Sequence, residues 1–173
     1  MAAKMNIHDN RANKQTYIQE QTNNYSTYFG EKNEKKIEFD VALSFAAEQQ
    51  EFVNKVYHYL RAYNLKVFFA PECQDILVGK NQREIFMKIF GIISEYIVLF
   101  VSKNYIVREV PMEEANIAFH SHEIGKIIPV CLDEARLPNK MLNPKELNYY
   151  CSDNPAEIAI KIFQIIKATR TTL

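Results

Sequence analysis

The sequence contains no tryptophan, only four glycines and only three cysteines among its 173 residues. The glycines do not have the GxGxxG or GxxxxGK spacing of a phosphate-binding loop. HExxH and GxSxG motifs are also missing, and the four histidines lack acidic or cysteine partners at metal-ligand spacing. These absences disfavour a metal-dependent hydrolase and a Ser-His-Asp hydrolase.

The sequence also lacks an excess of either charge, since 21 Lys and Arg residues balance 21 Asp and Glu residues. A broad basic face for nucleic acid or anionic lipid is therefore not expected. No apolar run reaches the ~18 residues of a membrane span, and the first residues have no apolar signal-peptide core. We expect a cytoplasmic protein with no membrane contact and no direct nucleic-acid partner.

The three cysteines, Cys73, Cys131 and Cys151, are widely spaced and form no CxxC pair. An odd number at such spacing is typical of reduced thiols rather than of a disulfide framework or a zinc site. We therefore expect three free thiols.

A chain of this length forms one domain with a full core. Residues 1–36 are rich in Asn, Gln, Lys, Glu and Thr, and such a segment buries too little surface to offset its ordering entropy. We expect a polar N-terminal arm here, flexible or partly helical, ahead of a domain at residues 37–173. The alternative is a docking arm whose tyrosines pack on a partner or on a second copy.

Strands and helices are expected to alternate through the domain. The first strand, at residues 39–45, is apolar or small at six of its seven positions, as in a strand buried on both faces. Further strands are predicted at 65–69, 96–102, 127–132 and, as a short fifth, 147–150, with helices at 50–63, 81–93, 111–120 and 155–169. This order predicts an α/β fold with right-handed crossovers and one parallel sheet.

The loop from Ser44 to Gln50 directly follows the first predicted strand. In open α/β sheets the ligand crevice lies beyond the carboxyl ends of the strands. This loop is therefore the first place to expect a site.

The predicted helix at residues 111–120 carries two adjacent carboxylates. On a helical wheel, Glu113 falls on the solvent side with Asn116 and His120. Glu114 instead lies roughly 40–50° from the centre of the apolar side. A carboxylate in that position is paired, reaches solvent past its neighbours, or faces a pocket.

Several segments in this order and spacing resemble the bacterial branch of the TIR (Toll/interleukin-1 receptor) domains. They are FDVALSFAAEQQEFV, LKVFFA, LVGK, SEYIVLFVSKNY and the helix with Glu114, and the likeness runs from residue 39 to residue 168. The resemblance implies a flavodoxin-like TIR fold, with a central parallel sheet of about five strands flanked by helices. It also implies that residues 70–82 form the mobile BB loop of that family.

In enzymatic members of this family a catalytic glutamate follows a tryptophan by four residues, and that register places it at Glu114. The resemblance implies NAD+ as substrate with no further cofactor, and cleavage of its nicotinamide–ribose bond by hydrolysis or cyclisation. It also implies self-association through the BB loop, with possible help from the N-terminal arm. A role in prokaryotic antiphage defence or signalling, with a defence-system partner protein, is the matching expectation.

The sequence departs from the family at three positions near this site. Val110 and Val78 replace tryptophans, and Ala70 replaces an aspartate that often follows the second strand. Phe45, Phe69 or Tyr105 are expected to supply stacking surfaces in their place. The residues expected to contact substrate are Ser44, Phe45, Ala46, Ala47, Phe69, Lys80, Tyr105 and Val110.

Two other functions remain open at this point. The lost tryptophans and aspartate favour a non-enzymatic TIR interaction module, or an effector that mimics host TIR domains. A different N-glycosidase on a related flavodoxin-like fold, such as a nucleoside deoxyribosyltransferase, would turn over nucleosides and leave NAD+ untouched.

Overall fold

The computed structural model describes residues 36–138 and 147–171, and in these ranges strands and helices alternate. Five parallel strands form one sheet in the order β2-β1-β3-β4-β5. They are β1 (Phe39–Ser44), β2 (Val67–Phe68), β3 (Ser94–Val101), β4 (Ile127–Cys131) and β5 (Tyr150–Cys151). The predicted fold is confirmed, whereas the predicted arm at residues 1–36 lies outside the described residues except for Lys36.

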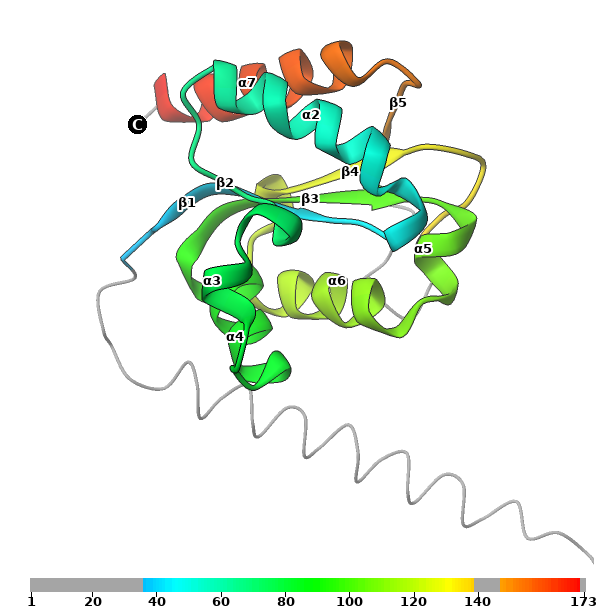
Figure 1. Cartoon of the computed structure of the whole chain (residues 1–173). Helices are drawn as coiled ribbons and strands as arrows, with labels where there is room; N and C mark the ends of the chain where they lie inside the picture. Colours follow the sequence, from blue (N-terminus) through cyan, green and yellow to red (C-terminus); the bar gives the residue numbers. More distant parts are fainter. Residues whose placement is uncertain (1–35, 139–146, 172–173) are drawn as a thin grey trace, which may run out of the picture. The chain divides into compact units, whose positions relative to one another are not determined.

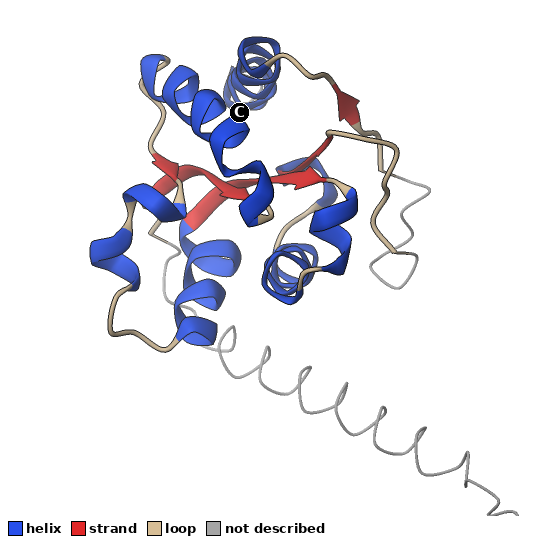
Figure 2. Cartoon of the chain, turned by 45° about the vertical axis from the view of Figure 1, so that its right-hand side comes forward, coloured by secondary structure: helices blue, strands red, loops and turns tan. Residues whose placement is uncertain are grey.

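Helices cover both faces of this sheet (Figures 1 and 2). On one face lie α2 (Gln50–Ala62) and α7 (Pro155–Thr171), and on the other lie α4 (Gln82–Lys88) and α6 (Glu109–Ser121). The short helices α3 (Gln74–Leu77) and α5 (Lys103–Val107) complete the connections that follow β2 and β3. No helix in the described ranges combines the length and apolar character needed to span a bilayer.

Strand β1 lies inside the sheet, and this position explains the apolar run at the start of the domain. It pairs with β2 on one edge and β3 on the other, and helices cover both faces of the sheet (Figure 1). Val41, Ala42 and Leu43 are accordingly buried, as expected for the centre of a parallel sheet. Ser44 pairs with Leu99 at the carboxyl end of the strand, which places its hydroxyl at the edge where the loop begins.

Two segments differ from the sequence predictions. The helix predicted at 81–93 is α4 followed by a π-helical turn, η3 (Ile89–Ile93), which buries Ile89, Phe90, Gly91 and Ile93. The loop from 70 to 82 contains the 3-10 turn η2 (Ala70–Glu72) and helix α3. Segments of three to five residues are too short to display a helical period in the sequence.

The prediction of three reduced cysteines is wrong for two of them. Cys131 and Cys151 are neighbours in the register of β4 and β5, with their Cα atoms 4.7 Å apart, and they form a disulfide. Cys73 is free. The pairing depends on which strands are adjacent in the sheet, and a separation of 20 residues along the chain gives no sign of it.

Candidate active site

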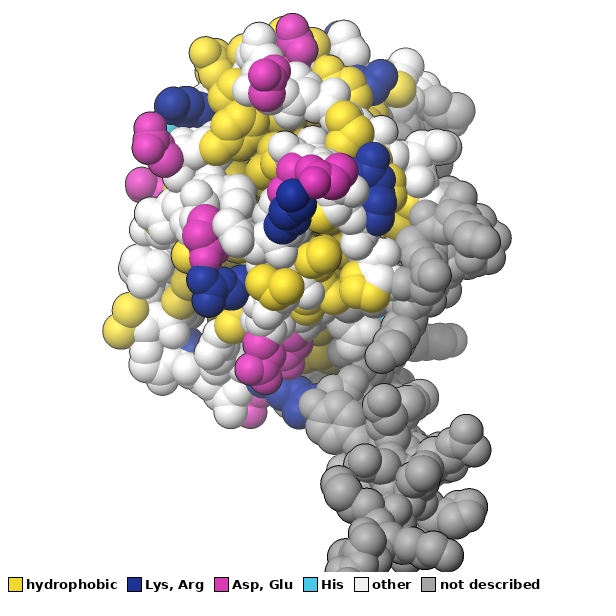
Figure 3. All heavy atoms as spheres, turned by 90° about the vertical axis from the view of Figure 1, so that its right-hand side faces the viewer, with side chains coloured by type: hydrophobic (Ala, Val, Ile, Leu, Met, Phe, Trp, Pro, Cys, Tyr) yellow, Lys and Arg dark blue, Asp and Glu magenta, His cyan; other side chains and the backbone are white. Residues whose placement is uncertain are grey.

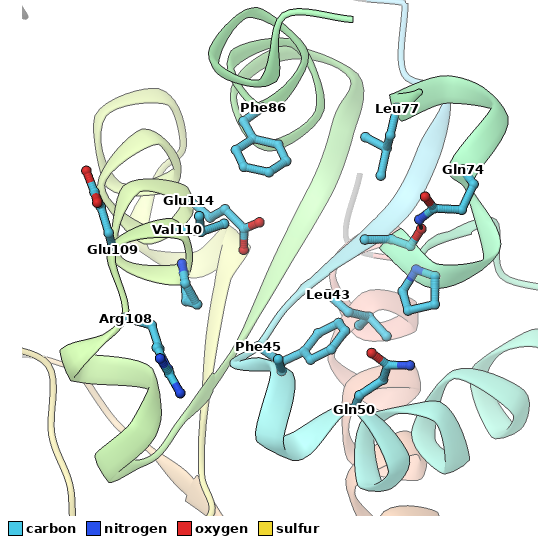
Figure 4. Close-up of a pocket in the computed structure, with 14 residues that line it drawn as sticks. Leu43, Phe45, Gln50, Gln74, Leu77, Phe86, Arg108, Glu109, Val110 and Glu114 are labelled. Atoms are coloured by element: carbon cyan, nitrogen blue, oxygen red, sulfur yellow. Dashed lines mark hydrogen bonds between the residues drawn. The ribbon is translucent and has the colours of Figure 1, made fainter. Parts of the chain in front are cut away.

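A pocket of about 590 Å³ opens at the carboxyl end of β1, between the loop after that strand and the first turns of α6 (Figure 4). Its walls are mostly apolar. The lining residues are Leu43, Phe45, Ala47, Gln50, Ala70, Pro71, Gln74, Leu77, Phe86, Arg108, Glu109, Val110, Pro111 and Glu114. The pocket lies where ligand crevices occur in open α/β sheets.

Glu114 projects into this pocket from α6 and is only 7% exposed. Its Oε2 accepts a hydrogen bond of 2.6 Å from the hydroxyl of Ser44. Glu113, next to it, lies on the outer side of α6 and pairs with Arg83 at 3.8 Å. The two adjacent carboxylates thus take the separate positions that the helical period predicts.

A second hydroxyl extends this contact into the core. The Tyr105 hydroxyl lies 2.7 Å from Ser44 Oγ and donates to the carbonyl of Pro111 at 2.9 Å. Tyr105 is fully buried and comes from α5, whereas Pro111 and Glu114 belong to α6. The chain of contacts therefore joins α6 to the end of β1 and to α5.

The number of protons available to this row of hydrogen bonds depends on whether Glu114 is protonated. Three oxygen–oxygen contacts run from Pro111 through Tyr105 and Ser44 to Glu114, but the two hydroxyls supply two protons. With Glu114 ionised, one of the three contacts lacks a proton. A protonated Glu114 supplies the third by donating to Ser44, whose own proton then goes to Tyr105, so this buried hydrogen-bond network favours the neutral acid.

Burial acts on Glu114 in the same direction. Removal from water raises its pKa to about 8, the hydrogen bond from Ser44 lowers it, and the nearby charge of Glu113 raises it. Burial also raises the pKa of Tyr105 well above its ordinary value, with a further rise from Glu114. A perturbed carboxyl group in a concave pocket is a mark of a functional site.

The structure brings together some of the residues predicted to contact substrate. Phe45, Ala47 and Val110 line the pocket together with Glu114. Ser44 lies directly behind this lining, bonded to Glu114, and the buried Ala46 follows in the same turn.

Other predicted contacts lie elsewhere. Phe69 is buried and stacks on Phe45 at 5.3 Å between ring centroids, so it supports the pocket wall from behind. Tyr105 has no exposed ring face to offer a ligand, since it is 0% exposed. Lys80 lines a separate pocket on the other side of α3 and α4, beside Asp75 and Glu84.

Sequence reasoning missed two charged residues of this pocket, Glu109 and Arg108. Arg108 precedes α6 at the pocket rim, and its Nε donates to Glu48 Oε1 at 3.1 Å. The hydrogen bond from Arg108 lowers the pKa of the Glu48 carboxyl. The two residues are 60 positions apart, so only the folded chain reveals the pair.

The comparisons with known proteins, by sequence and by structure, indicate the same family. The sequence profile described as TIR domain matches residues 41–159. The 3' cyclic ADP-D-ribose synthase AaTIR from Aquimarina amphilecti is 31% identical over 144 residues, covering 79% of this chain and 42% of that protein. The chain thus spans less than half the length of this curated relative.

Solved structures show the same fold at low sequence identity. The TIR domain of the Toll-related receptor TRR-2 from Hydra magnipapillata has a TM-score of 0.60 at 17% identity, covering 75% of this chain and 98% of that one. A metazoan TIR-STING receptor from C. gigas, in complex with 2',3'-cGAMP, has a TM-score of 0.61 at 16% identity, covering 75% and 40%.

Proposed function

This chain belongs to the TIR domain family, and we propose that it is an enzyme that cleaves the nicotinamide–ribose bond of NAD+. The observation that carries the proposal is the buried Glu114, held by Ser44 at the wall of an open, largely apolar pocket. The similarity to a 3' cyclic ADP-D-ribose synthase supports it.

The chemistry suits a pocket with one buried carboxylate. Nicotinamide leaves the ribose as a neutral molecule, so its departure needs no general acid. The ribose becomes oxocarbenium-like, and a carboxylate facing it stabilises the developing positive charge. Glu114 supplies this charge, whereas Glu109, the other carboxylate lining the pocket, is exposed and turned away from it in Figure 4.

Substrate binding itself brings Glu114 into its active state. The pyridinium ring of NAD+ carries a positive charge, and an opposite charge nearby favours the ionised carboxylate. The pKa of Glu114, about 8 before binding, therefore falls when the dinucleotide enters.

Two products follow from the same intermediate. Attack by water gives ADP-ribose, and attack by a nucleophile of the same molecule gives a cyclic isomer. The similarity to AaTIR supports the cyclic outcome. A place in prokaryotic antiphage defence or signalling belongs to the same proposal.

We further propose that the enzyme works as an assembly of copies that touch through the BB loop at residues 70–82. Val78, in this loop, is 71% exposed. Gly79 beside it has a φ of +75° and nothing within 4 Å of an added side chain, as in an open turn.

The second candidate is a TIR interaction module without enzymatic activity. The observations that favour it are the apolar Val110 at the pocket wall and the exposed apolar side chains of Val78 and Val107. Such side chains are more useful in a contact with another protein than in solvent.

The test is chromatography of NAD+ incubated with the purified chain at high concentration, beside Glu114→Gln and Glu113→Gln. The enzyme predicts nicotinamide release by the parent chain and by Glu113→Gln, and none by Glu114→Gln. The co-product then separates hydrolase from cyclase. Intact NAD+ in every sample, under crowding as well, supports the interaction module, and turnover of nucleosides with intact NAD+ supports the other N-glycosidase.

A further inference from the structure

The described residues that line the active-site pocket include one positively charged side chain, Arg108. The remaining charged residues of the lining are the carboxylates Glu109 and Glu114. NAD+ carries two negative charges on its diphosphate, and apolar walls beside carboxylates do not compensate them. A dinucleotide that presents its ribose to Glu114 therefore needs a cation at the same pocket.

We propose that Arg108 binds the diphosphate of the dinucleotide, and that Glu48 is the partner it exchanges for this group. The inference rests on the proposed function, because it names the group that holds the NAD+ substrate beside Glu114. It adds a substrate-binding residue that determines specificity for dinucleotides over nucleosides, which lack the diphosphate.

The contact between Arg108 and Glu48 favours such an exchange. Both Nε and Nη2 of the guanidinium contact the same carboxylate oxygen, Oε1 of Glu48. A guanidinium presents parallel donors that match two separate oxygens, as phosphate groups offer. The present pair therefore uses the donors of Arg108 less well than a diphosphate would.

Because both side chains are partly exposed, little free energy is lost when Arg108 separates from Glu48. The side chain of Arg108 is 60% exposed and that of Glu48 is 33% exposed. Ion pairs in such surroundings contribute little to stability and are screened by salt. The view in Figure 3, towards the carboxyl end of the sheet, shows that most basic side chains on this face lie against acidic ones. A diphosphate must therefore compete with a carboxylate for its cation.

The position of Arg108 fits the covalent structure of the substrate. Arg108 directly precedes α6, and Glu114 lies further along the same helix on the same wall, opposite Phe45 (Figure 4). The diphosphate of NAD+ is attached to C5' of the ribose whose C1' carries nicotinamide. With C1' facing Glu114 inside the pocket, the diphosphate is directed to the rim.

Other described cations nearby do not take this place. Lys80 lines a separate pocket. Lys103 forms an exposed ion pair with Glu134 at 2.6 Å and does not line the active-site pocket. Lys103 is thus a matched control, since it is a paired, exposed cation only five residues before Arg108.

The test is calorimetric titration of the full chain carrying Glu114→Gln, which binds ligand without turning it over. NAD+, nicotinamide riboside and inorganic pyrophosphate are titrated into this parent and into versions that also carry Arg108→Gln, Lys103→Gln or Glu48→Gln. We expect Arg108→Gln to weaken NAD+ binding about tenfold or more, with riboside affinity unchanged. Lys103→Gln, which removes the same charge, is expected to bind NAD+ as the parent does.

Glu48→Gln releases the guanidinium and is expected to strengthen NAD+ and pyrophosphate binding several-fold, with no effect on the riboside. Equal NAD+ affinity in the parent and in Arg108→Gln would overturn the assignment, as would a loss of equal size for NAD+ and riboside. Failure of the proposed function looks different, because the parent would then bind neither NAD+ nor the riboside. Pyrophosphate binding that depends on Arg108 would even then support the anion site.

Discussion

The hydroxyl of Ser44 lies 2.6 Å from Oε2 of Glu114, although the two residues are 70 positions apart. This bond joins the end of β1 to α6, the helix that carries the proposed catalytic group. With Oε2 held by Ser44, Oε1 is the oxygen left for a substrate. The relationship also links the orientation of Glu114 to its ionisation, because Ser44 has one proton to donate.

The ionisation of Glu114 predicts a specific pH dependence. The pKa of Glu114 without bound ligand is about 8, so kcat/KM for NAD+ should rise about tenfold per pH unit below that value. The kcat limb should lie at lower pH, because the bound pyridinium cation favours the carboxylate. Initial rates of nicotinamide release between pH 5.5 and 9 measure both limbs. A kcat/KM that does not change across this range would contradict the assignment.

Replacement of Ser44 by alanine should separate orientation from burial. Ser44→Ala removes the bond that holds Glu114, and we expect kcat to fall about 10- to 100-fold with a smaller change in KM. The kcat/KM limb should also move to higher pH, since the hydrogen bond from Ser44 lowers the pKa of Glu114.

The matched control for this variant is Ser94→Ala. Ser94 is as buried as Ser44, but it begins β3, and its hydroxyl has no hydrogen-bond partner among the described residues. Its replacement should leave activity and pH profile unchanged. If both serine variants lose activity equally, the bond to Glu114 is not the cause.

The Tyr105→Phe variant should shift the pH limb in the opposite direction. Without the tyrosine hydroxyl, Ser44 has no second hydroxyl beside it, and its proton is available to Glu114. The ionised carboxylate then keeps the hydrogen bond from Ser44 without leaving another contact short of a proton, so the pKa of Glu114 should fall and the kcat/KM limb should move to lower pH.

Stability alone does not explain such a shift, and Tyr96→Phe provides the comparison. Tyr96 is also fully buried, and its hydroxyl accepts from Lys126 Nζ at 3.1 Å, away from the pocket. Loss of a buried hydrogen bond should lower the unfolding free energy of either variant by roughly 1–3 kcal/mol. Only Tyr105→Phe should change the pH profile. If Tyr105→Phe and Tyr96→Phe have the same profile, the shortage of protons among Glu114, Ser44 and Tyr105 does not set the pKa of Glu114.

The sequence predicts the parts of this site that depend on local periodicity. Phe39–Ser44 is apolar or small at every position except Asp40, and the helical period separates Glu114 from Glu113. The family register independently selects Glu114. These features need no knowledge of which elements are adjacent in space.

The remaining parts depend on contacts between distant segments. Tyr105 was expected to stack on substrate, but its hydroxyl instead meets Ser44, 61 positions away. Lys80 was expected to contact substrate, but the turn and helix within residues 70–82 place it at another pocket. The Arg108–Glu48 pair arises in the same way, because polar side chains at the ends of separate elements find partners only after the sheet has formed.

The buried Glu114 should also make the fold less stable as pH rises. Its pKa is raised by burial from 4.5 in the reference state to about 8 in the folded chain. The folded state therefore binds a proton that the unfolded state has released, and stability is highest below pH 4.5 as far as this group is concerned. This contribution is lost progressively as pH rises to about 8, and the total is roughly 2–5 kcal/mol.

Glu114→Gln has no carboxyl group to ionise, so it should lack this loss. We expect the variant to unfold at a higher temperature than the parent at pH 8.5, with the difference shrinking towards pH 5. Glu113→Gln loses a partly exposed contact with Arg83 and the smallest of the effects on the pKa of Glu114, so it should stay close to the parent at both pH values. Thermal unfolding followed by circular dichroism measures all three chains. A constant difference between Glu114→Gln and the parent across this range would mean that Glu114 is already ionised in the folded chain, and it would remove the physical basis for a substrate-triggered carboxylate.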